Sequence, residues 1–188
     1  MKVAIETGPT PMRHCGGCTL CCKLLPVTEL DKGAGERCRH QRTGKGCAVY
    51  NIVGKMPPCC HFWNCRWLVN DDTADLPRPD RSHYVIDLLP DYVTVVDNET
   101  GGKTNVEVIQ IWCDPKHPDA HRDPALRRYL ERRAAEGKMA LVRYDSKTAF
   151  TLMPPTMTDD GKWHEHFSEV DVGRGYSLAQ VAAALEKP

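Results

Sequence analysis

The chain has 188 residues, and its 25 acidic and 25 basic side chains give a formal net charge of zero at pH 7. This length allows one hydrophobic core, or one core with a small appended module. The charge balance argues against a protein that binds nucleic acid or an anionic membrane through a global electrostatic field, and no apolar run is long enough to span a bilayer. We therefore expect neither nucleic acid nor membrane as a partner.

The first segment, residues 1–14, carries Pro9 and Pro11, which oppose a helix, and we expect an unstructured or strand-like lead-in. It lacks the apolar run of a signal peptide, so the expected compartment is the cytoplasm. A reducing compartment disfavours disulfides and leaves metal ligation or redox chemistry as the better interpretation of the cysteines that follow.

The next segment is organised by cysteine, since nine of the ten cysteines lie between Cys15 and Cys65. Its first motif is C-x2-C-x2-CC, and a two-residue gap lets two thiolates bind one ion at about 2.3 Å. Glycines at positions 16 and 17 suit this tight turn. Two adjacent side chains rarely point at the same metal. The pairs Cys21-Cys22 and Cys59-Cys60 therefore indicate either two centres, or one ligand and one packed thiol in each pair.

Between these motifs, residues 33–47 form a polar, glycine-rich segment that carries Cys38 and Cys47 and has no helical or strand periodicity. We expect the metal to hold this loop in place. Prolines before Cys59 exclude a continuing helix there. Three aromatic residues follow, and they are expected either to limit water at the site or simply to pack. They are Phe62, Trp63 and Trp67.

The order of these motifs resembles the YkgJ-type cysteine-cluster family, which is described as a zinc- or iron-chelating domain or as an iron–sulfur protein. The resemblance rests on C-x2-C-x2-CC, the lone Cys38, GC-x-V-Y at 46–50, C-x2-F-x2-C at 59–65 and the tryptophan that follows. It covers about residues 15–90, including RPDRSH at 78–83.

The resemblance implies eight cysteines as the metal-site set. These are Cys15, Cys18, Cys21, Cys22, Cys38, Cys47, Cys59 and Cys65. Cys60 departs from the family pattern, and its role stays open. It is kept with His14 and His61 as a candidate for an additional ligand or an outer hydrogen-bond partner, because imidazole also suits zinc.

The residue types leave the metal open, since all-thiolate sites suit zinc, iron–sulfur clusters and Cu(I). The C-x2-C-x2-C run is similar to the first three ligands of a bacterial ferredoxin cluster, but the Cys-Pro that ends such a run is absent. Eight cysteines divide evenly into two four-thiolate sites, which fits two zinc ions or one zinc beside one cluster. We expect zinc in protein isolated in air and keep iron, as an iron–sulfur cluster, as the alternative in the cell.

Residues 81–188 are expected to form an α+β layer, on which the loop-rich cysteine module at 15–80 packs. Alternating β-branched segments predict a small antiparallel sheet. Its strands are expected at 83–89, 92–96, 105–112, 139–144 and 148–152.

Two helices are expected in this layer. The main helix is predicted at 123–137, where Asp123 and Pro124 begin it and Gly137 ends it. Its apolar face is predicted from its spacing. That face consists of Ala125, Leu126, Tyr129, Leu130 and Ala134. A short C-terminal helix is predicted at 177–186, capped by Ser177.

Several residues outside the cysteine module have ordinary interpretations that outweigh functional ones. The arginines of the main helix could bind an anion, but such spacing is typical of a solvated face. They are Arg127, Arg128, Arg132 and Arg133. We interpret His164 and His166 as surface histidines. His40 is expected either to donate a hydrogen bond to a metal ligand or to take no part in the site. Cys113 is expected to be a small, buried hydrophobic residue.

The sequence thus predicts a metal-binding protein whose thiolate centre is structural or electron-carrying. Metal ions are the expected partners, and a protein partner is left open. The alternative is a metal- or cluster-dependent enzyme, or a metal-transfer protein. No Ser-His-Asp set, phosphate loop or carboxylate pair stands out in the sequence, so no catalytic residue is assigned.

Overall fold

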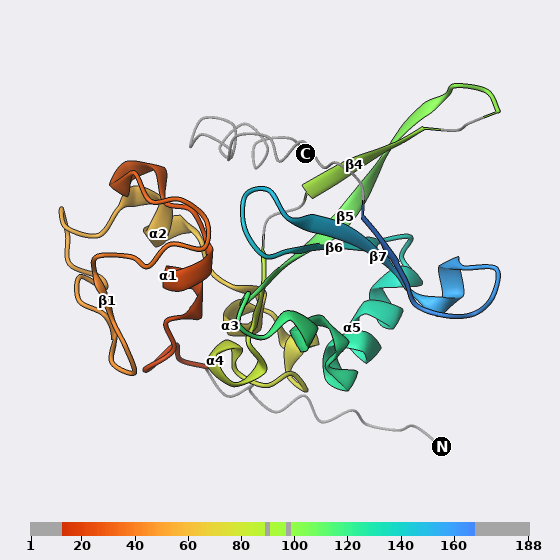
Figure 1. Cartoon of the computed structure of the whole chain (residues 1–188). Coiled ribbons are helices and arrows are strands. Elements are labelled where there is room, and N and C mark those ends of the chain that lie inside the picture. The colour runs from red at the N-terminus through yellow and green to blue at the C-terminus, as the bar shows by residue number, and fades with distance from the viewer. Residues whose placement is uncertain (1–12, 89–90, 97–98, 168–188) are drawn as a thin grey trace, which may run out of the picture.

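The computed structural model describes residues 13–88, 91–96 and 99–167. Figure 1 shows a loop-rich part on the left, formed by the first third of the chain, beside a twisted sheet with one longer helix, α5 (Pro124–Ala134). The predicted α+β class is confirmed. The predicted C-terminal helix at 177–186 lies outside the described residues, as does most of the lead-in.

The loop-rich part contains only short elements. Its helices are α1 (Leu20–Leu24), α2 (Pro58–Phe62), α3 (Arg66–Val69) and α4 (Pro79–Ser82), with 3₁₀ turns at Thr28–Leu30 and Asp71–Thr73. Two strands of two residues each, β1 (Gln41–Arg42) and β2 (Gly46–Cys47), form a hairpin. Helices of four or five residues are not stable alone, so tertiary contacts or a bound ion must hold this part together.

The sheet is built around one long strand, β5. Its strands are β3 (Tyr84–Ile86), β4 (Asp91–Val96), β5 (Lys103–Cys113), β6 (Met139–Arg143), β7 (Ala149–Met153) and β8 (His164–His166). β3 and β4 pair antiparallel with successive halves of β5, and the β6–β7 and β7–β8 pairs are also antiparallel. The β5–β6 pair is parallel. This one pair departs from a purely antiparallel sheet, because the connection between the two strands contains α5 and crosses over the sheet.

Helix α5 spans Pro124–Ala134, and the carboxylate of Asp123 accepts a 2.9 Å hydrogen bond from the Ala125 backbone N–H at its start. The predicted N-cap is therefore confirmed. Two 3₁₀ turns flank this region, at Pro118–Arg122 and Pro155–Met157. On the exposed side of α5, Arg132 and Arg133 pair with Asp75 and Asp72 at 3.3 and 3.4 Å, respectively. These arginines carry local ion pairs rather than a free anion-binding stripe.

Successive side chains of β5 point to opposite faces of the sheet, and both faces are buried. On one face, Ile109, Ile111 and Cys113 pack in a single core with Leu126 and Tyr129 of α5. Cys113 is fully buried there, as the sequence predicts for a small hydrophobe.

On the opposite face of the sheet, Val85 and Trp112 pack against Leu20 and Leu24 of α1. This second core attaches the loop-rich part to the sheet. No helix of the described residues is long and apolar enough to cross a membrane.

Candidate metal centre

All ten cysteines are free thiols. The first motif forms a tight turn, in which the Cys18 N–H donates to the Cys15 carbonyl at 2.8 Å and Gly16 takes a φ of +52°. At the next position, a Cβ on Gly17 would lie 2.4 Å from the carbonyl oxygen of Gly44. The two glycines therefore let the C-x2-C turn rest directly on the β1–β2 hairpin turn, as the sequence predicts for a tight turn.

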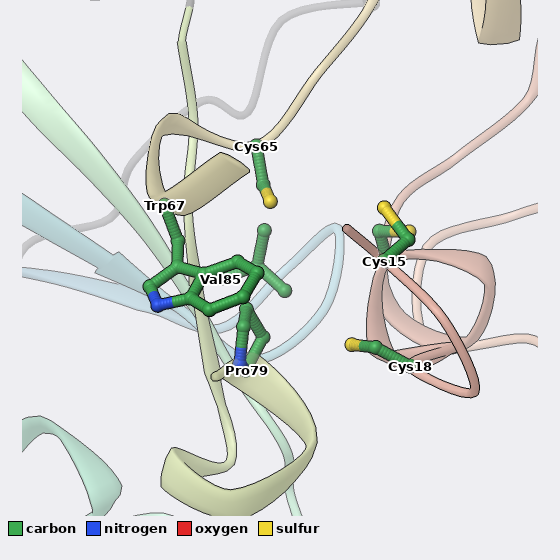
Figure 2. Close-up of a pocket in the computed structure, with 7 residues that line it drawn as sticks. Cys15, Cys18, Cys65, Trp67, Pro79 and Val85 are labelled. Atoms are coloured by element: carbon green, nitrogen blue, oxygen red, sulfur yellow. The ribbon is translucent and has the colours of Figure 1, made fainter. Parts of the chain in front are cut away.

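Four cysteines from two separate segments line one small cavity. These four, which we call thiol group A, are Cys15, Cys18, Cys21 and Cys65. The cavity has a volume of about 20 Å³, and its remaining lining is Trp67, Pro79 and Val85. Figure 2 shows the thiols of Cys15 and Cys18 on one side of this space and that of Cys65 on the other. The space is apolar apart from the sulfurs and suits an ion rather than an organic ligand.

Electrostatics show how closely the thiols of group A are gathered. Burial, with the charges of Cys15 and Cys18 added, raises the pKa of Cys65 to about 12, although the Leu68 N–H opposes this shift. The pKa of Cys21 is also well above its usual range, because its thiol hydrogen-bonds to Cys22, is buried, and faces Cys65 and Cys18. Thiolates crowded in this way repel one another, and a bound cation would remove that cost.

Tryptophans close the outer side of group A. Trp63 and Trp67 pack into the core that contains Cys65, and the Trp63 indole N–H donates to Asp87 at 2.7 Å. Trp63 and Trp67 are packed, which both expected roles allow. Phe62 fits neither role, because its side chain is 72% exposed.

A second set of cysteines gathers beyond α1. These residues, which we call thiol group B, are Cys22, Cys38, Cys47 and Cys60. The Cys38 N–H donates to the Cys22 carbonyl at 2.9 Å, and the β1–β2 ladder pairs Cys47 with Gln41. Burial raises the pKa of Cys47, and the charges of the other three members add to this shift. Screening limits appreciable charge interactions to roughly 10 Å, so the four side chains share one region.

The adjacent pair Cys21-Cys22 is divided between the two groups. The Cys21 thiol donates to Cys22, which lowers the pKa of Cys22 to about 7 despite burial, and the ammonium of Lys32 assists. Lys32 is itself only 7% exposed. The charge of Cys22 also raises the pKa of Cys15, so the two groups are neighbours.

The second adjacent pair, Cys59-Cys60, has its sulfurs 3.8 Å apart. Cys60 accepts a hydrogen bond from Cys59, which lowers the pKa of Cys60, and among its further influences is the charge of Cys22. For Cys59 the hydrogen bond to Cys60, burial and Glu29 all raise the pKa. The Glu29 carboxylate also accepts from the Cys59 backbone N–H at 3.0 Å.

Backbone N–H groups are aimed at sulfurs in both groups. The donor lies two residues after the cysteine in each of three cases. The backbone N–H of Leu20 donates to the Cys18 sulfur, that of His40 donates to the Cys38 sulfur at 3.4 Å, and that of Val49 donates to the Cys47 sulfur. Such donors stabilise a charged sulfur, which is the form that binds a metal.

The histidines beside the cysteines make no such contact through their rings. His14 and His61 are exposed, and His40 is half-buried and reaches Cys38 through its backbone. His164 lies on β8 with its ring 2.9 Å from the carboxylate of Asp160, and His166 is exposed.

A different group of ligand atoms is more compact than either thiol group. Within the described ranges, His83, Asp114 and His117 form the one set of three histidine, cysteine or carboxylate side chains whose ligand atoms all lie within 4.8 Å of one another. No three cysteine sulfurs meet this limit within the same ranges. A tetrahedral zinc site needs sulfurs about 3.8 Å apart, so the thiol groups must contract for zinc or hold a wider iron–sulfur cluster.

The cysteine content, its close pairs and the His/Asp group are all compatible with metal binding. No family model matches this chain, and neither a curated protein nor a solved structure gives a significant match.

Proposed function

We propose that this chain is a metal-binding protein that holds zinc or iron in two thiolate centres, one at thiol group A and one at thiol group B. The resemblance to the YkgJ-type cysteine-cluster family supports the same assignment. The proposal places Cys60 in group B and gives Cys59 an outer role beside Glu29, whereas the family pattern assigns Cys59 as the ligand.

The convergence of four cysteines on one small cavity carries the proposal. Cys15, Cys18 and Cys21 come from the first motif, and Cys65 comes from the start of α3, more than forty residues later. Only Cys65 of the four is buried and the other three are half-buried, so packing of the core does not by itself account for four free thiols around one space of this size. Four thiolates around one ion satisfy the tetrahedral preference of zinc, and they also suit an iron–sulfur cluster.

The proposed role is structural in the first instance. A metal at group A would tie α1 to α3, and both helices pack on the same end of the sheet through Leu24 and Trp67. An electron-carrying role follows only if the metal is an iron–sulfur cluster. The cytoplasm, as a reducing compartment, would keep these thiols available for metal.

Two buried cysteines provide a matched test. Cys65 is 7% exposed and belongs to group A, whereas Cys113 is fully buried in the core beneath α5. In protein purified without oxygen, Cys65→Ser should lower the metal content by about half, as one of two centres is lost. Cys113→Ser should leave the metal content unchanged. Equal metal loss from both variants would count against the assignment.

A further inference from the structure

A second kind of ligand cluster lies where β3 meets the end of β5. Tyr84 of β3 pairs with Cys113 of β5, and this register sets the preceding residue, His83, beside Asp114. The Asp114 N–H donates to the His83 carbonyl at 2.9 Å, and the His117 N–H donates to the Asp114 carbonyl at 2.7 Å. Backbone hydrogen bonds therefore fix all three residues relative to one another.

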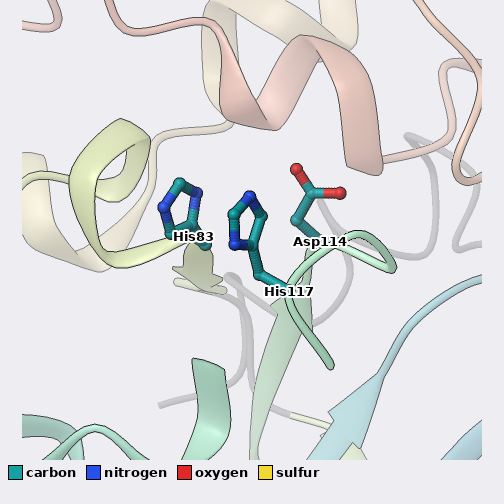
Figure 3. A group of neighbouring side chains, drawn as sticks. All are labelled: His83, Asp114 and His117. Atoms are coloured by element: carbon teal, nitrogen blue, oxygen red, sulfur yellow. The ribbon is translucent and has the colours of Figure 1, made fainter. Parts of the chain in front are cut away.

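The side chains of these residues converge as well. The rings of His83 and His117 stack with centroids 3.5 Å apart and planes 7° apart, and Figure 3 shows the Asp114 carboxylate beside them. His83 has a φ of +63°, a left-handed conformation that is uncommon for a residue with a side chain. This conformation ends α4, where the His83 N–H donates to the Pro79 carbonyl. The ring itself lies with its ligand atom within 4.8 Å of those of Asp114 and His117, and this proximity points to a use for the ring.

Asp114 is held in the manner of a ligating carboxylate. It is 5% exposed, and one of its oxygens accepts from the ammonium of Lys23. The other oxygen accepts from the Lys116 N–H at 3.0 Å. An ionised carboxylate has about four lone-pair positions, so these contacts leave acceptor capacity free. Ligating carboxylates are commonly oriented by such outer hydrogen bonds.

The histidines open onto solvent. Both line an open groove of about 510 Å³, whose walls also include Arg81, Lys116 and Asp119. A metal ion could therefore enter from this side and keep positions for water or an external ligand. Asp114, by contrast, approaches from the buried side.

We propose that His83, Asp114 and His117 form a mononuclear site for a divalent transition metal ion of the zinc or ferrous iron class, separate from the thiol groups. Two imidazoles and one carboxylate are a donor set that suits these ions and leaves open coordination positions. Binding requires the stacked rings to turn so that their in-plane nitrogen lone pairs meet at one point. The site shares elements with thiol group A, because Lys23 belongs to α1 and His83 follows α4, which contributes Pro79 to the thiol cavity. It nevertheless requires no cysteine.

The test uses the full chain with its thiol groups already filled with metal, and Co²⁺ as the probe. Wild-type protein should bind one further Co²⁺ per chain, with weak ligand-field absorption and no sulfur-to-cobalt charge transfer. His117→Ala should weaken this binding at least about tenfold. His117 is exposed, so this variant should fold normally, which a thermal melt checks. Asp114→Asn should weaken binding by a similar factor.

The matched control is His166→Ala, which removes an exposed histidine on β8 and should bind Co²⁺ as the wild type does. Three results would overturn the site. They are a wild type that binds no further Co²⁺, a His117→Ala variant that binds it unchanged, and charge-transfer absorption showing that the added Co²⁺ sits on sulfur. In the first case the stacked rings and the Lys23–Asp114 ion pair would be ordinary structural contacts.

Discussion

Removal of metal should unfold the cysteine module while the sheet survives. Between Cys15 and Cys65 the described elements are helices of at most five residues and a hairpin of two-residue strands, which cannot persist alone. Structural zinc contributes on the order of 10 kcal/mol to the folding of such modules. Chelation should therefore remove most of what holds this segment together.

The cost to the sheet can be worked from the packing between the two parts. Leu20 and Leu24 bury themselves against Val85 and Trp112. Each buried leucine contributes about 1.5–3 kcal/mol, so unfolding of the module should lower the free energy of unfolding of the sheet by roughly 3–6 kcal/mol. The core beneath α5 is unaffected, so the sheet of the metal-free protein should still melt cooperatively, at a lower temperature than in the metal-loaded protein.

Hydrogen–deuterium exchange read by mass spectrometry measures this directly. After chelation, peptides covering residues 15–65 should lose protection, while peptides from β5, α5 and β6 retain it. Readdition of metal should restore protection and serves as the control for irreversible damage. Protein that is stoichiometrically metal-free yet equally protected over 15–65 would refute the reasoning.

Three further predictions concern individual cysteines. Cys21→Ser and Cys22→Ser should each lose about half of the bound metal, from different centres, and the double variant should lose nearly all of it. Metal analysis measures these losses. A double variant that loses no more metal than either single variant would point to one shared centre. Cys60→Ser should lower metal content more than Cys59→Ser, and the reverse order would restore the family pattern. Burial raises the pKa of Cys65 to about 12, so metal binding must displace thiol protons. The apparent affinity for metal, measured by chelator competition, should therefore rise between about pH 6 and 8. A metal affinity independent of pH would contradict thiolate ligation.

Local sequence signals were sufficient for most of the sheet and for α5. The Asp123-Pro124 start and the apolar spacing that follows act within a few residues, and the structure confirms both. The parallel β5–β6 pair was missed because strand direction depends on how the intervening connection crosses the sheet. A helix inside that connection was the available signal for a crossover.

The cysteine spacing left open whether there are two centres or one ligand and one packed thiol in each adjacent pair, and it could not group the sulfurs. Successive residues of a helix point about 100° apart, so Cys21 and Cys22 in α1 can face different thiol groups even though their thiols hydrogen-bond to each other. Which direction each takes depends on how α1 packs against the sheet, and this is a tertiary property. The His83 group was invisible for the same reason, since its members meet only through the β3–β5 register.

X-ray absorption at the metal edge, on full-length protein purified without oxygen, tests the central claim most directly. The proposed thiolate centres predict stoichiometric zinc or iron with a first shell of about four sulfurs at roughly 2.3 Å. Iron neighbours in the second shell would identify a cluster, and their absence in a zinc spectrum would identify separate zinc ions. Protein without stoichiometric metal, or a first shell made mainly of oxygen and nitrogen, would contradict the claim.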